Sequence, residues 1–342
     1  MKNDVANTAW ALYVFNWYAI GIVGGLLLAA IYLTEFELNL NSVIIGGGFV
    51  AVYGAFAWYN AARRHRQDPQ VVFVLGGFSQ IVLVTLIMTP LTYLAAALNW
   101  PMQDDALKQI DRALGLDWLA YLSFINAYPV LAIWIDFAYG MIKWPLFIVP
   151  VALAACRRYD RIQHFVLAFL LGLIVTAAIS IFVPALGAYQ AFDLSIRDFP
   201  LFGRHAYEGA LVDLPAVRDG SLRMLDLGAL NGVVTFPSFH AASAVIYLWA
   251  LWPAGFMRFV AIVTNGAMLA ATPIVGGHYF IDIIGGVAVA IAAIAAAGVI
   301  CRRVAMQVAP PPERDSVPIA ASRLGTARVP NITSLETVHR LR

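Results

Sequence analysis

The segments Phe-Pro-Ser-Phe-His at residues 236–240 and Gly-His-Tyr-Phe-Ile-Asp at residues 277–282 hold ionisable side chains in an otherwise apolar part of the chain. Their histidines, His240 and His278, are 38 positions apart, which corresponds to about two membrane crossings of ~20 residues each. Both histidines would therefore return to the same face of a bilayer. Because ionisable residues in membrane segments are costly and usually functional, these two segments are the candidate active site.

The composition is that of a membrane protein. Of 342 residues, 61% are hydrophobic and only 12% are charged, whereas a soluble domain is nearer half apolar and a quarter charged. We therefore predict an all-α, polytopic bundle of membrane helices. The formal net charge of +2 gives no reason to expect a nucleic-acid partner. The two cysteines, Cys156 and Cys301, form no zinc-ligand spacing, and we expect neither a metal nor a cofactor.

Apolar runs and basic clusters together predict a topology. We expect eight spans, near residues 10–33, 42–61, 71–98, 129–155, 162–186, 236–254, 258–276 and 279–301. Basic residues follow the second span, the fourth and the last: Arg63, Arg64, Arg66, Arg157, Arg158, Arg161, Arg302 and Arg303. Positive charge favours the cytoplasmic side, so both termini and these clusters would be cytoplasmic. We divide the chain into N-terminal transmembrane helices (1–105), a catalytic membrane core (106–303) and a disordered cytoplasmic tail (304–342).

The segment 106–128 is interpreted as a helix that lies on the membrane surface. It places Leu107, Ile110 and Leu114 on one helical face, and Pro129 would separate it from the fourth span. Tryptophans near the ends of apolar runs favour an interfacial or lipid-facing position: Trp100, Trp118, Trp249 and Trp252.

The two segments can support covalent phosphoryl transfer. His278 and Asp282 are four residues apart and share a helical face, so the carboxylate could hold one imidazole N–H and leave the other nitrogen free to attack. His240 could protonate a leaving oxygen. Ser238 and the first amides of its helix would suit an anion, although Ser238 could equally be only a helix cap. Gly277 would let a phosphate approach the backbone.

The same residues resemble a known family. Phe-Pro-Ser-Phe-His-Ala at 236–241 and His-Tyr-Phe-Ile-Asp at 278–282 are similar to signature motifs of the type 2 phosphatidic acid phosphatase (PAP2) superfamily, and most similar to its branch of inositol phosphorylceramide synthases. The resemblance implies that His278 attacks phosphorus to give a phosphohistidine, that Asp282 orients it, and that His240 protonates the leaving group.

Two departures from the family pattern remove expected phosphate-binding cations. Ala271 and Thr272 stand where the third motif has Ser-Arg. The first motif has a lysine seven residues before Arg-Pro, whereas Pro150 stands seven residues after Lys143 and no arginine is present. The candidate replacements are Lys143, Arg204, Arg218 and Arg223. Lys143 lies seven residues after Asp136 and could instead be half of a structural ion pair with it. The arginines could instead be solvated or paired with nearby acids.

We therefore expect a membrane phosphatase that cleaves a phospholipid, polyprenyl or sphingolipid phosphate without a metal. The first alternative is a phosphotransferase like inositol phosphorylceramide synthase, which moves a phospho-head group to an alcohol or lipid. The second is a non-catalytic lipid transporter. An outward-facing site and the absence of organelle signals fit a bacterial inner membrane, with the site facing the periplasm.

Overall fold

The computed structural model describes residues 2–63, 68–202 and 205–308, and these are almost entirely helical. The predicted tail, Arg64, Arg66 and Arg204 lie wholly or mainly outside this range. The helices are α1 (Lys2–Tyr32), α2 (Leu40–Ala62), α3 (Pro69–Ala96), α4 (Asp104–Ala113), α5 (Trp118–Asn126), α6 (Pro129–Gly140), η1 (Met141–Lys143), α7 (Pro145–Ala155), α8 (Tyr159–Phe182), α9 (Ala188–Ala191), η2 (Ile196–Asp198), α10 (His205–Asp219), α11 (Phe239–Leu251), α12 (Met257–Val275) and α13 (Phe280–Val308).

The expected membrane bundle is confirmed, but not the count of eight continuous spans. Among the described residues, six helices are long and apolar enough to cross a bilayer: α1, α2, α3, α8, α12 and α13. The run 129–155 is wrong as a single helix. It divides into α6, η1 and α7, and Pro145 begins α7, because proline supplies no backbone N–H to continue the preceding helix. The run 236–254 contains only the shorter helix α11.

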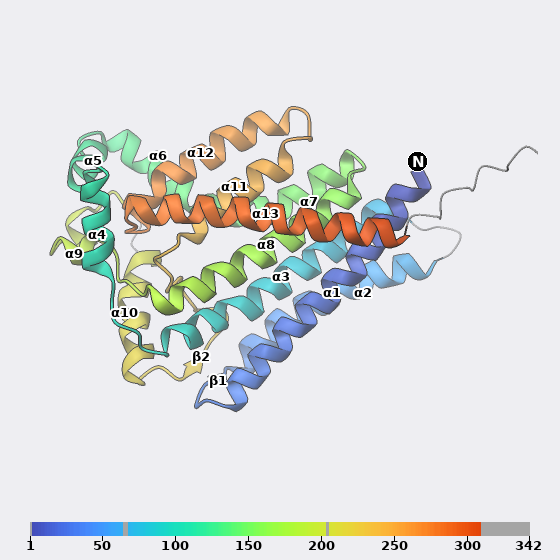
Figure 1. The fold of residues 1–342 in the computed structure, drawn as a ribbon, viewed down its shortest axis with the longest axis horizontal. Coiled ribbons are helices and arrows are strands. Elements are labelled where there is room, and N and C mark those ends of the chain that lie inside the picture. The colour runs from blue at the N-terminus through green and yellow to red at the C-terminus, as the bar shows by residue number, and fades with distance from the viewer. Residues whose placement is uncertain (1, 64–67, 203–204, 309–342) are drawn as a thin grey trace, which may run out of the picture. The chain divides into compact units, whose positions relative to one another are not determined.

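Helix α8 lies at the centre of the bundle and packs against α1, α3, α11 and α13 (Figure 1). Its apolar residues point in several directions, and those buried almost completely include Ile162, Phe165 and Leu170. A helix that is apolar all round is one buried among other helices. Helix α2 packs mainly against α3, and its exposed apolar side chains suit a lipid-facing position.

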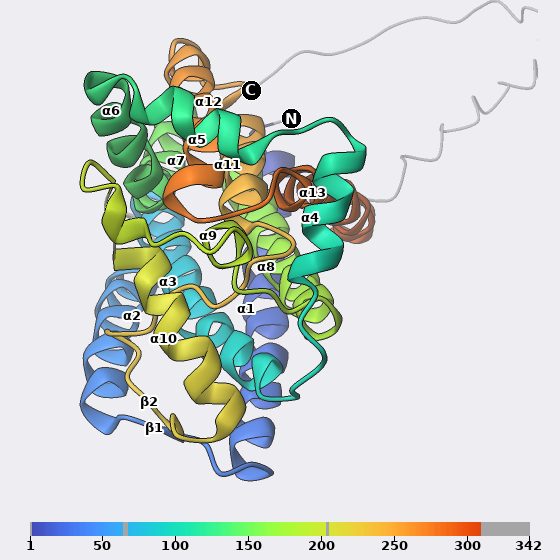
Figure 2. The ribbon, with the colours of Figure 1, turned by 90° about the vertical axis from the view of Figure 1, so that its left-hand side faces the viewer.

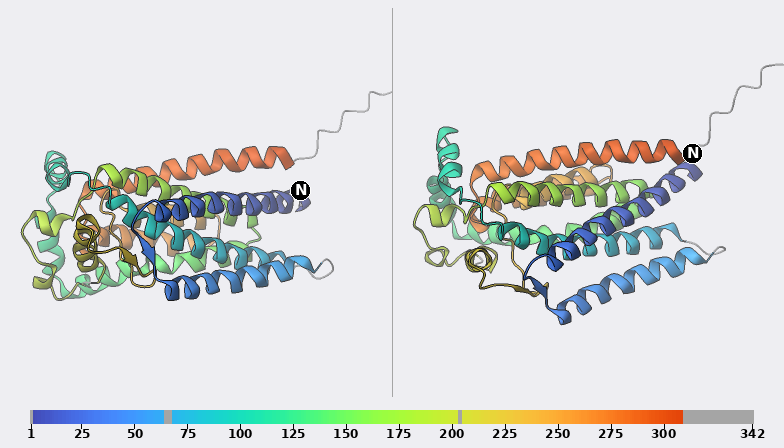
Figure 3. Two further views of the ribbon diagram at one scale, coloured as in Figure 1. Left: turned by 90° about the horizontal axis from the view of Figure 1, so that it is seen from below. Right: turned by 60° about the horizontal axis from the view of Figure 1, so that its bottom comes forward.

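Short helices gather at one end of the bundle, and we call α4, α5, α9, η2 and α10 the cap (Figures 2 and 3). Helices α5 and α6 meet at a bend of 113°, and Pro129 is the first residue of α6. Proline is well tolerated in the first turn of a helix and disfavours helical backbone in the residue before it. The cap is therefore set across the direction of the long helices and covers the ends of α11 and α13.

Two links join the cap region to the N-terminal helices. The two-residue strands β1 (Glu37–Leu38) and β2 (Met224–Leu225) pair in parallel, which ties the α1–α2 connection to the segment after α10. The hydroxyl of the buried Tyr93, on α3, donates to Asp213 of α10 at 2.6 Å and accepts from the backbone N–H of Asn231 at 2.9 Å. These bonds fix the chain that leads into α11.

Candidate active site

The two sequence segments meet at the starts of α11 and α13. The backbone N–H of Ser238 donates to the carbonyl oxygen of Asp282 at 2.9 Å. One turn further along α13, Gly286 lies against Ser238, because a Cβ on this glycine would be only 2.2 Å from the Ser238 carbonyl oxygen. Small residues allow such close approach between membrane helices. The sequence expectation that these segments lie together is therefore matched by direct backbone contact.

His278 and Asp282 form a buried pair at the start of α13. Nδ1 of His278 lies 3.2 Å from Oδ2 of Asp282, and the same oxygen accepts the backbone N–H of Tyr279 at 2.9 Å. His278 is 5% exposed and Asp282 is fully buried. A carboxylate at Nδ1 favours the tautomer with its proton on that nitrogen. The remaining nitrogen, Nε2, then carries the lone pair.

Ser238 lies at that second nitrogen. Its hydroxyl oxygen is 3.4 Å from Nε2 of His278 and also accepts the backbone N–H of Ala241, which caps α11. The helix-cap interpretation of this serine is thus confirmed, and the serine also lies beside the candidate nucleophile. The start of α11 also directs unbonded amides and the positive end of the helix dipole toward this region.

His240 is the second residue of α11, and it is half-buried. Its imidazole stacks on the ring of Tyr139 from α6, with centroids 4.0 Å apart and planes inclined by 12°. Tyr139 also approaches His278, because a Cβ on Gly276 would lie 2.7 Å from both the tyrosine hydroxyl oxygen and Cδ2 of His278. The stacking on Tyr139 therefore brings the second imidazole, which α11 and α6 hold, near the first.

Two aspartates of the cap, which the sequence analysis did not single out, form hydrogen bonds with the segment next to the candidate nucleophile. Asp111 of α4 accepts the backbone N–H groups of Phe280 and Ile281 at 2.7 and 2.8 Å, which caps α13 from another helix. Burial raises the pKa of this carboxyl above its ordinary value. Asp104 accepts the Tyr279 hydroxyl at 2.9 Å, together with two backbone amides of the segment before α9.

The expectation that Trp118 lies in a lipid-facing belt is wrong. Its side chain is 2% exposed, and its indole N–H lies 3.1 Å from the carbonyl oxygen of Pro273 and 3.2 Å from that of His278. A buried indole N–H requires an acceptor, and the last turn of α12 and the segment before α13 provide one carbonyl oxygen each. Trp118 is thus a support for the backbone of the candidate nucleophile.

Gly277 has a conformational role that limits its use as a phosphate contact. Its φ is +65°, in the left-handed region that glycine adopts without strain. A Cβ here would lie 2.4 Å from Cε2 of Tyr207, so the tyrosine ring already covers this backbone. The carbonyl oxygen of Gly277 accepts the N–H of Ala188 at 2.7 Å, which joins α9 to the turn before His278.

The candidate cations are dispersed. The guanidinium of Arg218 donates to the carbonyl oxygen of Trp100 at 2.8 Å. Arg223 donates to the carbonyl oxygen of Val217 at 2.9 Å, and its guanidinium lies 4.6 Å from the centre of the Phe36 ring. Both arginines thus have structural partners in the segments that join the cap to the N-terminal helices, whereas Arg204 is outside the described residues.

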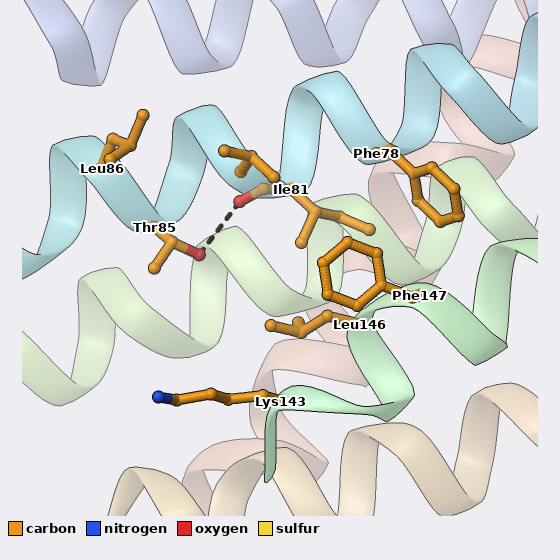
Figure 4. Close-up of a pocket in the computed structure, with 8 residues that line it drawn as sticks. Phe78, Ile81, Thr85, Leu86, Lys143, Leu146 and Phe147 are labelled. Carbon is orange, nitrogen blue, oxygen red and sulfur yellow. Dashed lines mark hydrogen bonds between the residues drawn. The ribbon is translucent and has the colours of Figure 1, made fainter. Parts of the chain in front are cut away.

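Lys143 lies at an apolar groove. A groove of about 270 Å³ runs between α3 and the η1–α7 segment, and Figure 4 shows the extended lysine along one side of it. The lining is otherwise uncharged: Phe78, Ile81, Val82, Thr85, Leu86, Leu146 and Phe147. Lys143 is exposed, and its ammonium is in no ion pair found within the described part of the chain.

The described residues include no group of three or more His, Cys, Asp or Glu side chains placed to hold a metal ion. The arrangement instead provides a histidine with one nitrogen free, a carboxylate that orients it, and a second histidine opposite. This set of groups suits nucleophilic attack followed by proton transfer.

Comparison with protein families agrees with this geometry. The family model of the PAP2 superfamily matches residues 105–296, a segment that begins in α4, ends within α13 and contains Ser238, His240, His278 and Asp282. Comparisons with curated proteins and with solved structures find no match. Members of the matched superfamily are usually phosphatases or phosphoesterases. Since the match covers more than half of the chain, this protein belongs to the PAP2 superfamily.

Proposed function

We propose that this protein is an integral membrane lipid-phosphate phosphatase that works through a phosphohistidine at His278. The observation that carries the proposal is the position of this imidazole. Nδ1 lies 3.2 Å from the Asp282 carboxylate, while Nε2 faces Ser238 at the start of α11. A histidine held in this way presents a lone pair to a phosphoryl group next to a helix start that favours anions.

In the first step, the Nε2 lone pair of His278 attacks phosphorus and the bond from phosphorus to the leaving oxygen breaks. His240 gives its proton to that oxygen, so the alcohol leaves neutral. The proton on Nδ1 of His278 stays on that nitrogen and is hydrogen-bonded to Asp282, whose negative charge balances the phosphorylated imidazole. The unbonded amides at the start of α11 would stabilise charge on the phosphoryl oxygens.

In the second step, His240 takes a proton from water as the water oxygen attacks phosphorus. The bond between phosphorus and Nε2 breaks, its electron pair returns to the imidazole, and inorganic phosphate is released. With an alcohol in place of water, the same steps turn a monoester substrate into another phosphomonoester and a phosphodiester substrate into a new phosphodiester. The residues of the site serve either acceptor.

The groove at Lys143 supports a lipid as the substrate. Its lining is apolar, and its single charged residue is a cation. Lys143 follows Tyr139 by four residues, and Tyr139 stacks on His240, so the chain links one side of the groove to the neighbour of the proposed proton donor. An acyl chain in this groove would bury apolar surface while its phosphate lies within reach of the ammonium or the histidines.

One observation favours the transferase alternative. At the positions where the phosphatase motif has Ser-Arg, Ala271 and Thr272 are fully buried, and the Thr272 hydroxyl donates to the carbonyl oxygen of Met268. Neither residue offers charge to a phosphate, as in the ceramide phosphotransferase branch. We also propose that the site faces the periplasm of a bacterial inner membrane, and the cytoplasmic side that positive charge favours for the basic clusters supports this orientation.

The test uses the full chain in detergent with EDTA, a panel of lipid phosphates and phosphodiesters, and inositol or glycerol as optional acceptors. We expect release of phosphate from a monoester and an acid-labile, alkali-stable phosphoenzyme. Both should disappear in His278→Ala and fall strongly in Asp282→Asn. A phosphodiester formed only with an acceptor would make the protein a transferase. Equal activity of wild type and His278→Ala, or no activity with any substrate, would refute phosphohistidine chemistry and favour transport.

A further inference from the structure

Tyr139 contributes a ring and a hydroxyl to the same space as the two histidines. It lies near the end of α6, is 8% exposed, and stacks almost parallel to the imidazole of His240. Stacking on a rigid ring restricts the plane of the imidazole without using either of its nitrogens. Among the described residues neither nitrogen of His240 has a hydrogen-bond partner, so both are available for proton transfer.

The Tyr139 hydroxyl lies next to the nucleophile. A Cβ on Gly276 would come within 2.7 Å of the tyrosine hydroxyl oxygen and equally within 2.7 Å of Cδ2 of His278. Because both atoms border one small volume, they are close neighbours. Cδ2 is bonded to Nε2, the nitrogen that attacks in the proposed reaction. The hydroxyl is therefore near the position that a phosphoryl group on Nε2 would occupy.

This hydroxyl has no hydrogen-bond partner among the residues that the structure describes. Two other tyrosines of the region do have one: Tyr279 donates to Asp104 and Tyr121 to the carbonyl oxygen of Ala270. The Tyr189 hydroxyl also has none, but its oxygen is fully buried, whereas that of Tyr139 is not. An accessible, unbonded hydroxyl close to the candidate nucleophile can therefore donate to an acceptor supplied by the substrate.

We propose that Tyr139 is a catalytic residue whose hydroxyl donates a hydrogen bond to a phosphoryl oxygen of the substrate, while its ring holds His240. The proposal deepens the proposed phosphoryl-transfer function and rests on it. The hydroxyl would also replace part of the stabilisation that the missing phosphate-binding cations would give. Ala271 and Thr272 provide none, and Arg218 and Arg223 are bonded elsewhere. A neutral donor preorganised in a dry site can stabilise developing charge on a phosphoryl oxygen.

The purely structural alternative makes a different prediction. If Tyr139 only fills space and supports His240, its hydroxyl is dispensable and phenylalanine should serve as well. Because the hydroxyl bonds to no described residue, its removal should leave thermal stability unchanged or slightly higher. A catalytic role therefore appears as a loss of phosphoryl binding and turnover without a loss of stability.

The test compares full-length Tyr139→Phe with wild type, His278→Ala and the control Tyr128→Phe. Tyr128 immediately precedes α6 and is 56% exposed. Orthovanadate, a phosphoryl mimic, is the binding probe, and phosphatidic acid in detergent micelles is the turnover probe. We expect Tyr139→Phe to weaken vanadate binding and to lower kcat/KM by roughly 10- to 100-fold. Its melting temperature should stay at the wild-type value, and Tyr128→Phe should match wild type.

The remaining outcomes separate the two proposals. Vanadate affinity of Tyr139→Phe equal to wild type, with binding lost in His278→Ala, would overturn the role of Tyr139 alone. A lower melting temperature in Tyr139→Phe would show that the hydroxyl has a structural partner and would overturn it as well. Failure of wild type to bind vanadate, or equal binding by His278→Ala, would refute the phosphoryl site itself.

Discussion

Replacing Gly286 with alanine should separate the two catalytic helices. The added methyl group would lie 2.2 Å from the carbonyl oxygen of Ser238 and 2.9 Å from Cβ of Ala241. A carbon normally stays about 3.3 Å or more from a carbonyl oxygen. Because the opposing atom is backbone, no rotamer change relieves the overlap, and α13 must move away from α11 by roughly 1 Å.

That movement acts directly on the site. The bond from the Ser238 N–H to the Asp282 carbonyl oxygen, now 2.9 Å, lies one turn from Gly286 and would lengthen beyond hydrogen-bond range. The distance between Ser238 and Nε2 of His278 would grow with it. A misplacement of about 1 Å can cost about 100-fold in rate, and overpacking costs about 1–3 kcal/mol of stability.

The assay measures kcat/KM on the best lipid substrate and the melting temperature in detergent, with Gly266→Ala as the matched control. Gly266 also lies in a membrane helix, α12, but a Cβ there meets no atom within 4 Å. We expect the control to keep full activity and to gain up to about 1 kcal/mol from the better helix propensity of alanine. Activity of Gly286→Ala within twofold of wild type would refute the argument that this contact sets the geometry of the site.

Two further predictions concern the cap and the outer arginines. Asp111→Ala should lower stability by about 1–2 kcal/mol by uncapping α13 and should lower kcat, whereas the exposed Asp105→Ala on the same helix should do neither; equal effects would contradict the capping role. Because burial raises the pKa of Asp111, the folded chain holds this proton more tightly than the unfolded chain. The stability deficit of Asp111→Ala should therefore be largest below pH ~4 and shrink as the pH rises through the folded pKa. Arg223→Gln should lower the melting temperature with KM unchanged, because its guanidinium packs on Phe36; a KM raised tenfold would instead make it a substrate ligand.

The pairing of His278 with Asp282 could be predicted from the sequence because it is local. Residues four apart near a helix start share a face, so the composition of one short segment is sufficient. The membrane bundle was predictable for a similar reason, since a long apolar run needs no knowledge of its neighbours. Proline positions were less informative. Pro145 begins a new helix, but Pro90 and Pro273 lie inside continuous ones, because packing against neighbouring helices decides the outcome.

The supports of the site were not predictable because they join distant segments. Asp111 and Phe280 are 169 residues apart, and no local motif around Asp111 predicts that it contacts Phe280. A signal was present in the spacing of Asp104 and Asp111, seven residues apart on an amphipathic helix, which places both on one face. That spacing shows which carboxylates act together, but not the target that they bind.

The order of these contacts along the chain has a consequence for biosynthesis. The groups that hold the candidate nucleophile come from α4, α5 and the start of α11. His278 lies just before the last described helix, α13, and Asp282 lies in its first turn. The ribosome therefore synthesises α4, α5 and α11 before it synthesises His278 and Asp282. A chain interrupted before residue 278 would insert most of its helices and still be inert. Full activity should appear only once α13 has entered the bilayer and docked against α11.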